Sequence, residues 1–206
     1  MKAVFALLPT VVDARVRAFA IATLVAQILI VGTGGAVRLT GSGLGCPTWP
    51  RCTADSFVST PEMGIHGIIE FGNRLLTFVL VIIALVMFIL VLRMRKERRD
   101  LFVLALVIGL GIPAQAVVGG ISVLTNLDPY VVGLHFVVSV VLVVLSTILV
   151  YRVYDGRRGT VYLVPRWYVA LAWAASVLVA ITIAVGILTT GSGPHAGDAG
   201  AARNGL

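Results

Sequence analysis

The segment GGAVRLTGSGLGCPTWPRC at residues 34–52, followed by GIHGIIEFGNRLLT at residues 64–77, lies between two apolar stretches that are long enough to be membrane helices. It contains both cysteines of the chain, a glycine-rich loop, and a histidine, a glutamate, an asparagine and an arginine. Nearly everything outside it is apolar sequence with short connectors. We therefore expect the apolar stretches to set the fold and this segment to carry the chemistry.

The composition of the 206-residue chain is that of a membrane protein. Hydrophobic residues make up 59% of it and charged residues only 12%, whereas soluble domains carry about 25% charged residues. Five uncharged stretches approach or exceed the length of about 20 helical residues that crosses a bilayer. They are residues 18–37, 75–92, 101–127, 131–151 and 167–190, with the second helix starting earlier, near residues 61–64. The sequence predicts an all-α integral membrane protein with five transmembrane helices in a lipid bilayer.

The basic residues, which give the chain a net charge of +7, are clustered before the first span and after the second and fourth. The clusters contain Lys2, Arg15, Arg17, Arg93, Arg95, Lys96, Arg98, Arg99, Arg152, Arg157, Arg158 and Arg166. The other connectors carry only Arg38 and Arg51. The positive-inside rule therefore predicts a multi-pass protein of the plasma membrane with a cytoplasmic N-terminus and the 34–63 connector outside. Clusters of this kind orient a membrane protein, so nucleic acid is not expected as a partner.

Cys46 and Cys52 are the only cysteines, and the predicted topology places both on the oxidising side of the membrane. A disulfide is the default prediction for such a pair. Two unpaired thiols in a loop are the alternative. A zinc site is not expected, because two cysteines do not fill a tetrahedral shell.

An internal repeat is visible, since RLTGSGLG at residues 38–45 matches LTTGSGPH at residues 188–195. Each copy follows a predicted span, so the repeat unit would contain four helices. We expect the chain to be truncated after its fifth helix. The predicted parts are a cytoplasmic segment at 1–17, a first four-helix bundle at 18–151, a cytoplasmic connector at 152–166, and the incomplete start of a second bundle at 167–206.

One face of the second predicted helix is polar. His66, Glu70, Asn73 and Thr77 are spaced by four, three and four residues, which places them on one side of the helix. Ionisable groups in a membrane helix are costly and normally face the bundle interior. Arg74 flanks this face, and a simple ion pair between Glu70 and Arg74 is the alternative to a catalytic role for Glu70.

A second polar position in a predicted span is His135. It follows Pro129 by six residues, about 9 Å along a helix, and Glu70 follows Gly64 by the same number. A four-helix bundle would let the two side chains face each other across a shared cavity. Histidines on two helices can hold a haem iron. However, a lone histidine can equally bond to a backbone carbonyl, and His66 can simply face water.

Four stretches in this order resemble the haem A synthase family. They are GGAVRLTGSGLGCPTWPRC, IIEFGNRLLT, QAVVGGISVLTNLDPYVVGLHF and TGSGPHAGD, in residues 34–198. The resemblance implies eight transmembrane helices in two similar four-helix halves. It also implies an oxidoreductase that converts a porphyrin methyl group of haem O to a formyl group, making haem A for cytochrome c oxidase. Haem b would be the cofactor, held largely in the C-terminal half, and the N-terminal half would take the substrate.

The resemblance further implies roles for individual residues. His135 matches a histidine of the fourth helix that ligates haem. Glu70 matches a glutamate at the start of the second helix that is regarded as catalytically important. Cys46 and Cys52 match a cysteine pair of the outer loop, proposed to form a disulfide that supports or takes part in the reaction.

One position departs from the family pattern. The family commonly has a histidine three residues after the glutamate, whereas this chain has Asn73, whose amide is a poor ligand for iron. His66 on the same face could act as the ligand instead. Otherwise the iron would have His135 as its one protein ligand and an open position.

The mechanism implied by the resemblance has haem O entering from the bilayer, with its propionates near Arg38 and Arg74 and its iron on His135. Glu70 would take up protons as the methyl group is hydroxylated, and the electrons would leave to an unidentified acceptor. Expected partners are haem O synthase and cytochrome oxidase assembly proteins, and self-association into a homo-oligomer is left open.

Two other classes of protein remain as alternatives. One is a haem-binding electron-transfer module of the membrane that forms no product. The other is a membrane thiol oxidoreductase that uses Cys46 and Cys52. That class normally needs a C-x-x-C motif and a second cysteine pair, and this chain has neither.

Overall fold

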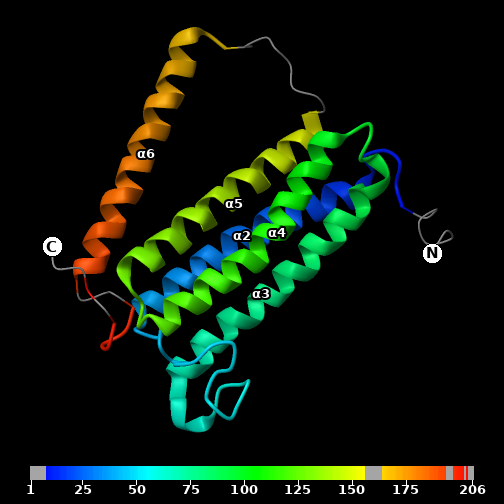
Figure 1. The fold of residues 1–206 in the computed structure, drawn as a ribbon. Helices are drawn as coiled ribbons and strands as arrows, with labels where there is room; N and C mark the ends of the chain where they lie inside the picture. Colours follow the sequence, from blue (N-terminus) through cyan, green and yellow to red (C-terminus); the bar gives the residue numbers. More distant parts are fainter. Residues whose placement is uncertain (1–7, 156–163, 194–196, 202, 204–206) are drawn as a thin grey trace.

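The chain folds into long helices joined by short loops (Figure 1). The computed structural model describes residues 8–155, 164–193, 197–201 and 203. The long helices are α2 (Ala14–Leu39), α3 (Gly64–Val91), α4 (Arg99–Leu124), α5 (Pro129–Asp155) and α6 (Arg166–Ser192). Each is long and apolar enough to cross a membrane, and the described residues contain no strand. The predicted all-α membrane protein with five spans is therefore confirmed.

Some predictions fall on residues outside this description. Lys2, Arg157 and Arg158, which contributed to the predicted orientation, lie outside the described residues. The same holds for parts of the predicted segments 1–17, 152–166 and 167–206.

Side-chain caps fix the start of two helices. Asp13 accepts a hydrogen bond from the Val16 N–H at the start of α2, and this bond holds the pKa of its carboxyl group below the ordinary value. Asp128 accepts from the N–H groups of Tyr130 and Val131 at the start of α5. Both helices therefore begin before the apolar stretches that predicted them.

Backbone conformation ends α4 early. The uncharged stretch runs to residue 127, whereas the helix stops at Leu124. Asn126 and Leu127 adopt left-handed backbone conformations, with φ of 52° and 58°. A left-handed residue breaks a right-handed helix, so residues 125–128 form a tight connector into α5.

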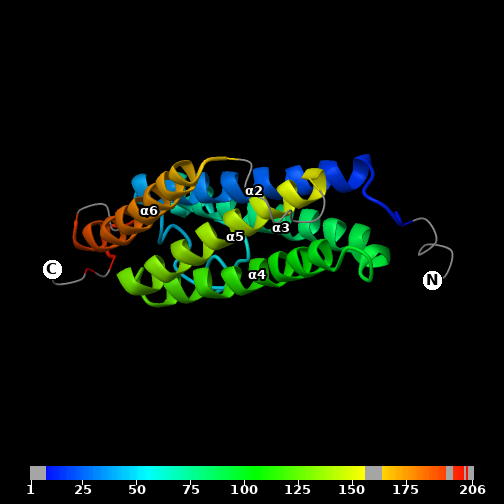
Figure 2. The ribbon, with the colours of Figure 1, turned by 90° about the horizontal axis from the view of Figure 1, so that it is seen from above.

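Helices α2 to α5 form a four-helix bundle (Figure 1, Figure 2). Helix α2 packs against α3 and α5, and α4 packs against the same two helices. It follows that α3 and α5 are diagonal to each other, as are α2 and α4. We call the end that carries the loop after α2 and the 125–128 connector the disulfide end, and the opposite end the basic end.

The apolar core is not spread evenly along the bundle. Its continuous cluster of buried side chains comes from residues 16–26 of α2, 80–94 of α3 and its extension, 101–112 of α4 and 149–153 of α5. All of these segments lie towards the basic end. The larger buried polar side chains are Gln27 near the middle of α2 and Glu70 and Gln115 towards the disulfide end, while the small hydroxyl residues Thr23 and Ser146 are buried nearer the basic end.

Helix α6 lies outside the bundle (Figure 1). Its side chains are largely exposed, and it approaches α5 only near the disulfide end, where Ile187 packs against Gly133. Beyond α6, the Gly197 carbonyl accepts a hydrogen bond of 2.9 Å from the Gly43 N–H. The chain after α6 therefore touches the loop after α2.

Candidate functional site

The loop after α2 is closed by a disulfide between Cys46 and Cys52, with an S–S distance of 1.95 Å. Both cysteines are fully buried. The predicted disulfide is confirmed, and the alternative of two free thiols is wrong. The closed loop covers the disulfide end of the bundle (Figure 1).

Glu70 joins this loop to α3. The residue is only 5% exposed. Its Oε2 accepts a hydrogen bond of 2.5 Å from the Cys46 N–H, and its Oε1 lies 2.5 Å from Nη2 of Arg74. The ion pair between Glu70 and Arg74, considered above as an alternative, is therefore present. A carboxylate bonded on both oxygens is one way to keep a charge in a buried position.

Arg74 also holds the loop, and we call the bonds of Glu70 and Arg74 to the loop the clamp. Besides Glu70, its guanidinium donates to the carbonyl oxygens of Cys46 at 2.9 Å, Thr48 at 3.0 Å and Arg51 at 3.1 Å. A guanidinium has five N–H groups, and these contacts together engage all of them. The expected pairing of Arg74 with a propionate would require it to leave these partners.

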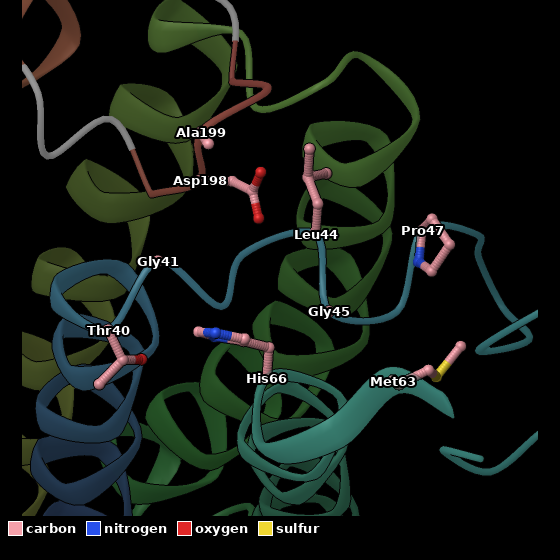
Figure 3. Close-up of a pocket in the computed structure, with 9 residues that line it drawn as sticks. All are labelled: Thr40, Gly41, Leu44, Gly45, Pro47, Met63, His66, Asp198 and Ala199. Carbon is pink, nitrogen blue, oxygen red and sulfur yellow. The ribbon is translucent and has the colours of Figure 1, made fainter. Parts of the chain in front are cut away.

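His66, one turn before Glu70, lines a pocket of about 580 Å³ at the disulfide end. Its Nδ1 lies 2.9 Å from Ser42 Oγ, which in turn lies 2.8 Å from Thr40 Oγ1. Figure 3 shows the imidazole directed towards the end of α2, with Asp198 of the C-terminal segment above it. Neither Glu70 nor His135 lines this pocket, so it is not the shared cavity expected between them.

Asn73 lies at the seam between α3 and α2. Its Oδ1 accepts a hydrogen bond of 2.7 Å from Thr33 Oγ1. His66, Glu70 and Asn73 thus all make their contacts on the side of α3 that faces α2 and the loop after it. The helical spacing had placed them on one face, but it could not name Thr33 or Ser42 as their partners.

His135 on α5 packs against α4. The closest approach is at Gly119, where a Cβ atom would come within 3.2 Å of His135 Cε1. One turn earlier, Gln115 Nε2 donates to the His135 carbonyl oxygen at 2.7 Å and to Ser139 Oγ at 2.5 Å. Gln115 thus bonds α4 to α5. Gly119 leaves room for the imidazole while Gln115 fixes the backbone that carries it.

The His135 imidazole has a nitrogen that is available for binding. Its Nδ1 is buried and has no hydrogen-bond partner among the described residues. A buried polar atom of this kind usually finds a partner, and a neutral imidazole nitrogen is a good ligand for iron. The described residues hold no group of three or more His, Cys, Asp or Glu side chains that could bind a metal ion.

The loop also reaches α4 through Trp49, which sequence reasoning missed. A Cβ atom at Gly120 would lie 2.4 Å from Cδ2 of the Trp49 ring, so only glycine permits this contact. Gly120 directly follows Gly119, which faces His135. Two separate features of the sequence could have indicated this contact. One is a tryptophan between two prolines of the loop, and the other is a Gly-Gly pair in a distant apolar helix.

Arg38 stands at the last turn of α2 and is half-buried. Its Cγ would lie 3.7 Å from a Cβ atom at Gly197, which places the arginine beside the segment after α6. Arg38 is therefore at the disulfide end, as is His66.

These features define a helical membrane protein with a disulfide-closed loop at one end of its four-helix bundle and a buried imidazole nitrogen that has no hydrogen-bond partner among the described residues. The model of the family COX15-CtaA, described as cytochrome oxidase assembly protein, matches residues 17–197. The chain belongs to this family, as its resemblance to haem A synthases had predicted.

Curated relatives agree with this assignment. A protein of Lysinibacillus sphaericus (strain C3-41) named heme A synthase is 31% identical over 173 residues, which cover 80% of this chain and 55% of that protein. Proteins of the same name from Bacillus pumilus (strain SAFR-032) and Listeria welshimeri are 32% and 28% identical, each over 149 residues. These matches cover 70% and 69% of this chain, and 46% and 48% of the respective relatives. The chain thus spans about half the length of the curated relatives it matches. No solved structure matches it.

Proposed function

We propose that the bundle of α2 to α5 is the substrate-binding half of a haem A synthase. In this half His135 holds haem O while one methyl group of the porphyrin is oxidised to a formyl group. The observation that carries the proposal is the buried Nδ1 of His135, which has no hydrogen-bond partner among the described residues. Membership of the COX15-CtaA family and the names of the relatives support it.

The uneven core of the bundle supports this placement. The continuous apolar core lies towards the basic end, and His135 lies in the other half, where the closely packed cluster does not extend. A four-helix bundle commonly builds a haem site from side chains of facing helices. Arg38, at the disulfide end of α2, is placed to meet the propionates, and the apolar faces of the helices suit the farnesyl chain.

The proposed reaction replaces two hydrogens of a methyl group by one oxygen, which is a net oxidation by four electrons. Two successive hydroxylations with oxygen from water, each releasing two electrons and two protons, give a geminal diol, which loses one water molecule to leave the formyl group. Glu70 accepts protons, as a buried carboxylate next to the site can, and the electrons pass to a separate acceptor. The loop closed by Cys46 and Cys52 covers the site and fixes Glu70 through the Cys46 N–H.

Three further parts of the proposal concern the whole protein. Haem b is its cofactor, held in the second bundle that α6 begins. The N-terminus lies in the cytoplasm and the protein in the plasma membrane, because the basic residues gather at one end of the bundle. Haem O synthase and cytochrome oxidase assembly proteins are its partners.

Haem extraction tests the proposed function. The chain is expressed in a host that makes haem O but no haem A, both alone and together with the second half of the Lysinibacillus relative. A formyl haem in the extract, identified by its pyridine haemochrome spectrum and its mass, is the expected result of co-expression. Haem O and haem b alone in both extracts would contradict the proposal.

The engagement of Glu70 favours one competing function, a haem-binding module for electron transfer. Both carboxylate oxygens are bonded, to Arg74 and to the Cys46 N–H, which is the state of a structural group. Such a module would retain haem b and yield no formyl haem in the same extract, so the pyridine haemochrome spectrum separates the two functions.

Replacing Asn73 with histidine tests the departure from the family pattern. Helices α3 and α5 are diagonal, and Asn73 lies about 14 Å along α3, compared with about 9 Å for His135 along α5. We expect Asn73→His to supply a second axial ligand, so that bound haem O changes from high-spin to low-spin in its absorption spectrum. Asn73→Ala, which removes the Thr33 contact without adding an imidazole, should leave the haem high-spin. A low-spin haem in the unmodified chain would show that another residue, such as His66, already ligates the iron.

A second substitution tests the packing of His135 against Gly119. Gly119→Val places a branched side chain where the imidazole lies, and overpacking of this kind typically costs about 1–3 kcal/mol. We expect haem O to bind about tenfold more weakly, as measured by optical titration. Gly109→Val is the matched control, because this glycine is on the same helix and a Cβ atom there meets nothing within 4 Å. Equal haem O affinities of Gly119→Val and Gly109→Val would show that Gly119 is not part of the haem site.

A further inference from the structure

Two buried amides in the bundle each have a polar atom without a partner. Gln27 on α2 is 2% exposed and Gln115 on α4 is 8% exposed. Nε2 of Gln27 and Oε1 of Gln115 have no hydrogen-bond partner among the described residues. Leaving such groups unpaired in an interior is unfavourable, and glutamine has apolar replacements of similar size. The two amides therefore point to a polar ligand group.

The two amides lie deeper in the bundle than His135. Measured along the helices from the disulfide end at about 1.5 Å per residue, His135 is about 9 Å deep, Gln115 about 14 Å and Gln27 about 18 Å. Gln115 is also tied to the histidine directly, because its Nε2 donates to the His135 carbonyl oxygen at 2.7 Å. Both amides are thus on the basic-end side of the candidate iron ligand.

The arrangement of the helices determines which side chains meet the edge of a bound porphyrin. An axial ligand on α5 sets the porphyrin plane across the line from α5 to α3. The edges of the plane then face the other diagonal, which is formed by α2 and α4. Gln27 and Gln115 are on these two helices. With the propionates at the disulfide end near Arg38, the edge that reaches the amides is the one opposite the propionates.

We propose that Gln27 and Gln115 form a subsite that binds the hydroxyl group at the base of the farnesyl chain of haem O. This inference rests on the proposed function, since it places haem O on His135. A hydroxyl group is both a donor and an acceptor. It donates to Oε1 of Gln115 and accepts from Nε2 of Gln27, which are the two atoms without partners.

The subsite would distinguish haem O from haem b. The two molecules share the porphyrin, iron and propionates, and haem b carries a vinyl group in place of the hydroxylated farnesyl substituent. A vinyl group can bond to neither amide, so both amides stay unpaired when haem b occupies the bundle. Sites that hydrogen-bond a substrate hydroxyl reject analogues without it, because the polar groups of the site are then left unpaired.

Gln27→Met tests the subsite by optical titration of the purified chain with haem O, haem A and haem b. Methionine has a similar volume and no amide, so the unliganded protein should be at least as stable as the original. We expect about tenfold weaker binding of haem O and haem A, which both carry the hydroxyl, and unchanged binding of haem b. Gln115→Met should weaken all three, because it also removes the bond to His135.

Thr23→Val is the matched control. Thr23 is buried one turn from Gln27 on α2, and its hydroxyl is already bonded to the Phe19 carbonyl oxygen. It should leave the ratio of haem O to haem b affinity unchanged. Unchanged haem O binding in Gln27→Met would overturn the subsite, and so would a loss confined to haem A, which would mean that the amide binds the formyl group. If the unmodified chain binds no haem O at all, the proposed function fails instead.

Discussion

Replacing Glu70 with glutamine is expected to lower the formation of haem A by at least about 100-fold, which is the usual contribution of a general acid or base. Glutamine keeps one oxygen, which can accept from the Cys46 N–H or from Arg74. The disulfide and the bonds from Arg74 to three loop carbonyl oxygens remain, and the position loses the ability to take up a proton. The loop should therefore stay closed while the chemistry stops. Formyl haem in membrane extracts measures the reaction, and the rate at which an added reductant opens the Cys46–Cys52 disulfide, followed by labelling of the freed thiols, measures the loop.

The structure supplies a control for this experiment. Glu62 is an exposed acid in the short turn before α3 and is outside the clamp. Glu62→Gln should leave both measurements unchanged. Wild-type amounts of haem A in Glu70→Gln would show that Glu70 is only a structural group. Loss of haem A together with faster reduction of the disulfide would mean that the contacts holding the loop, and not proton transfer, explain the loss.

Replacing His135 with alanine is expected to weaken haem O binding by at least about 100-fold, or about 2.8 kcal/mol. The imidazole is the one side chain of the bundle with a buried ring nitrogen that has no partner among the described residues, and alanine removes it. The absorption band of the bound haem should disappear from the purified protein at concentrations where the original chain is saturated.

His66→Ala is the corresponding control at the disulfide end. His66 is bonded to Ser42 and lines the pocket beneath the segment after α6, so its removal should not change the haem spectrum. An unchanged spectrum in His135→Ala would exclude ligation by that residue. A spectrum lost in His66→Ala alone would assign the iron to the pocket at the disulfide end.

The fold was predictable because its signals are local. A run of about 20 apolar residues must satisfy its backbone within itself, so each run predicts one helix. The residues at which the helices begin and end were less predictable. Helix α4 stops before its apolar run does, since Asn126 and Leu127 turn the chain with left-handed backbone. The disulfide followed from the presence of only two cysteines in a short loop.

The site was predictable only in part. Helical spacing placed Glu70 one turn from Arg74, and their ion pair is present. It could not show that Arg74 also binds three carbonyl groups of the loop, because those contacts depend on how an irregular segment folds back. The contacts of Thr33 with Asn73 and of Trp49 with Gly120 join residues far apart in the sequence. No periodic pattern reports such pairs.

Gln27 is a position whose functional importance the sequence could have indicated. It is the one amide side chain in an otherwise apolar first span, and polar residues in membrane helices usually have a function. Its meaning depended on the burial of the side chain and on the relation of α2 to α4, which the sequence does not contain.

The most direct test of the central claim is the identity of the haem that copurifies with the chain. The protein would be purified from membranes of a host that makes both haem O and haem b, and its bound haem extracted and identified by mass. We expect haem O in near-equal molar amount to the protein, and none with His135→Ala. Protein that carries only haem b, or equal haem O on the wild type and His135→Ala, would contradict it.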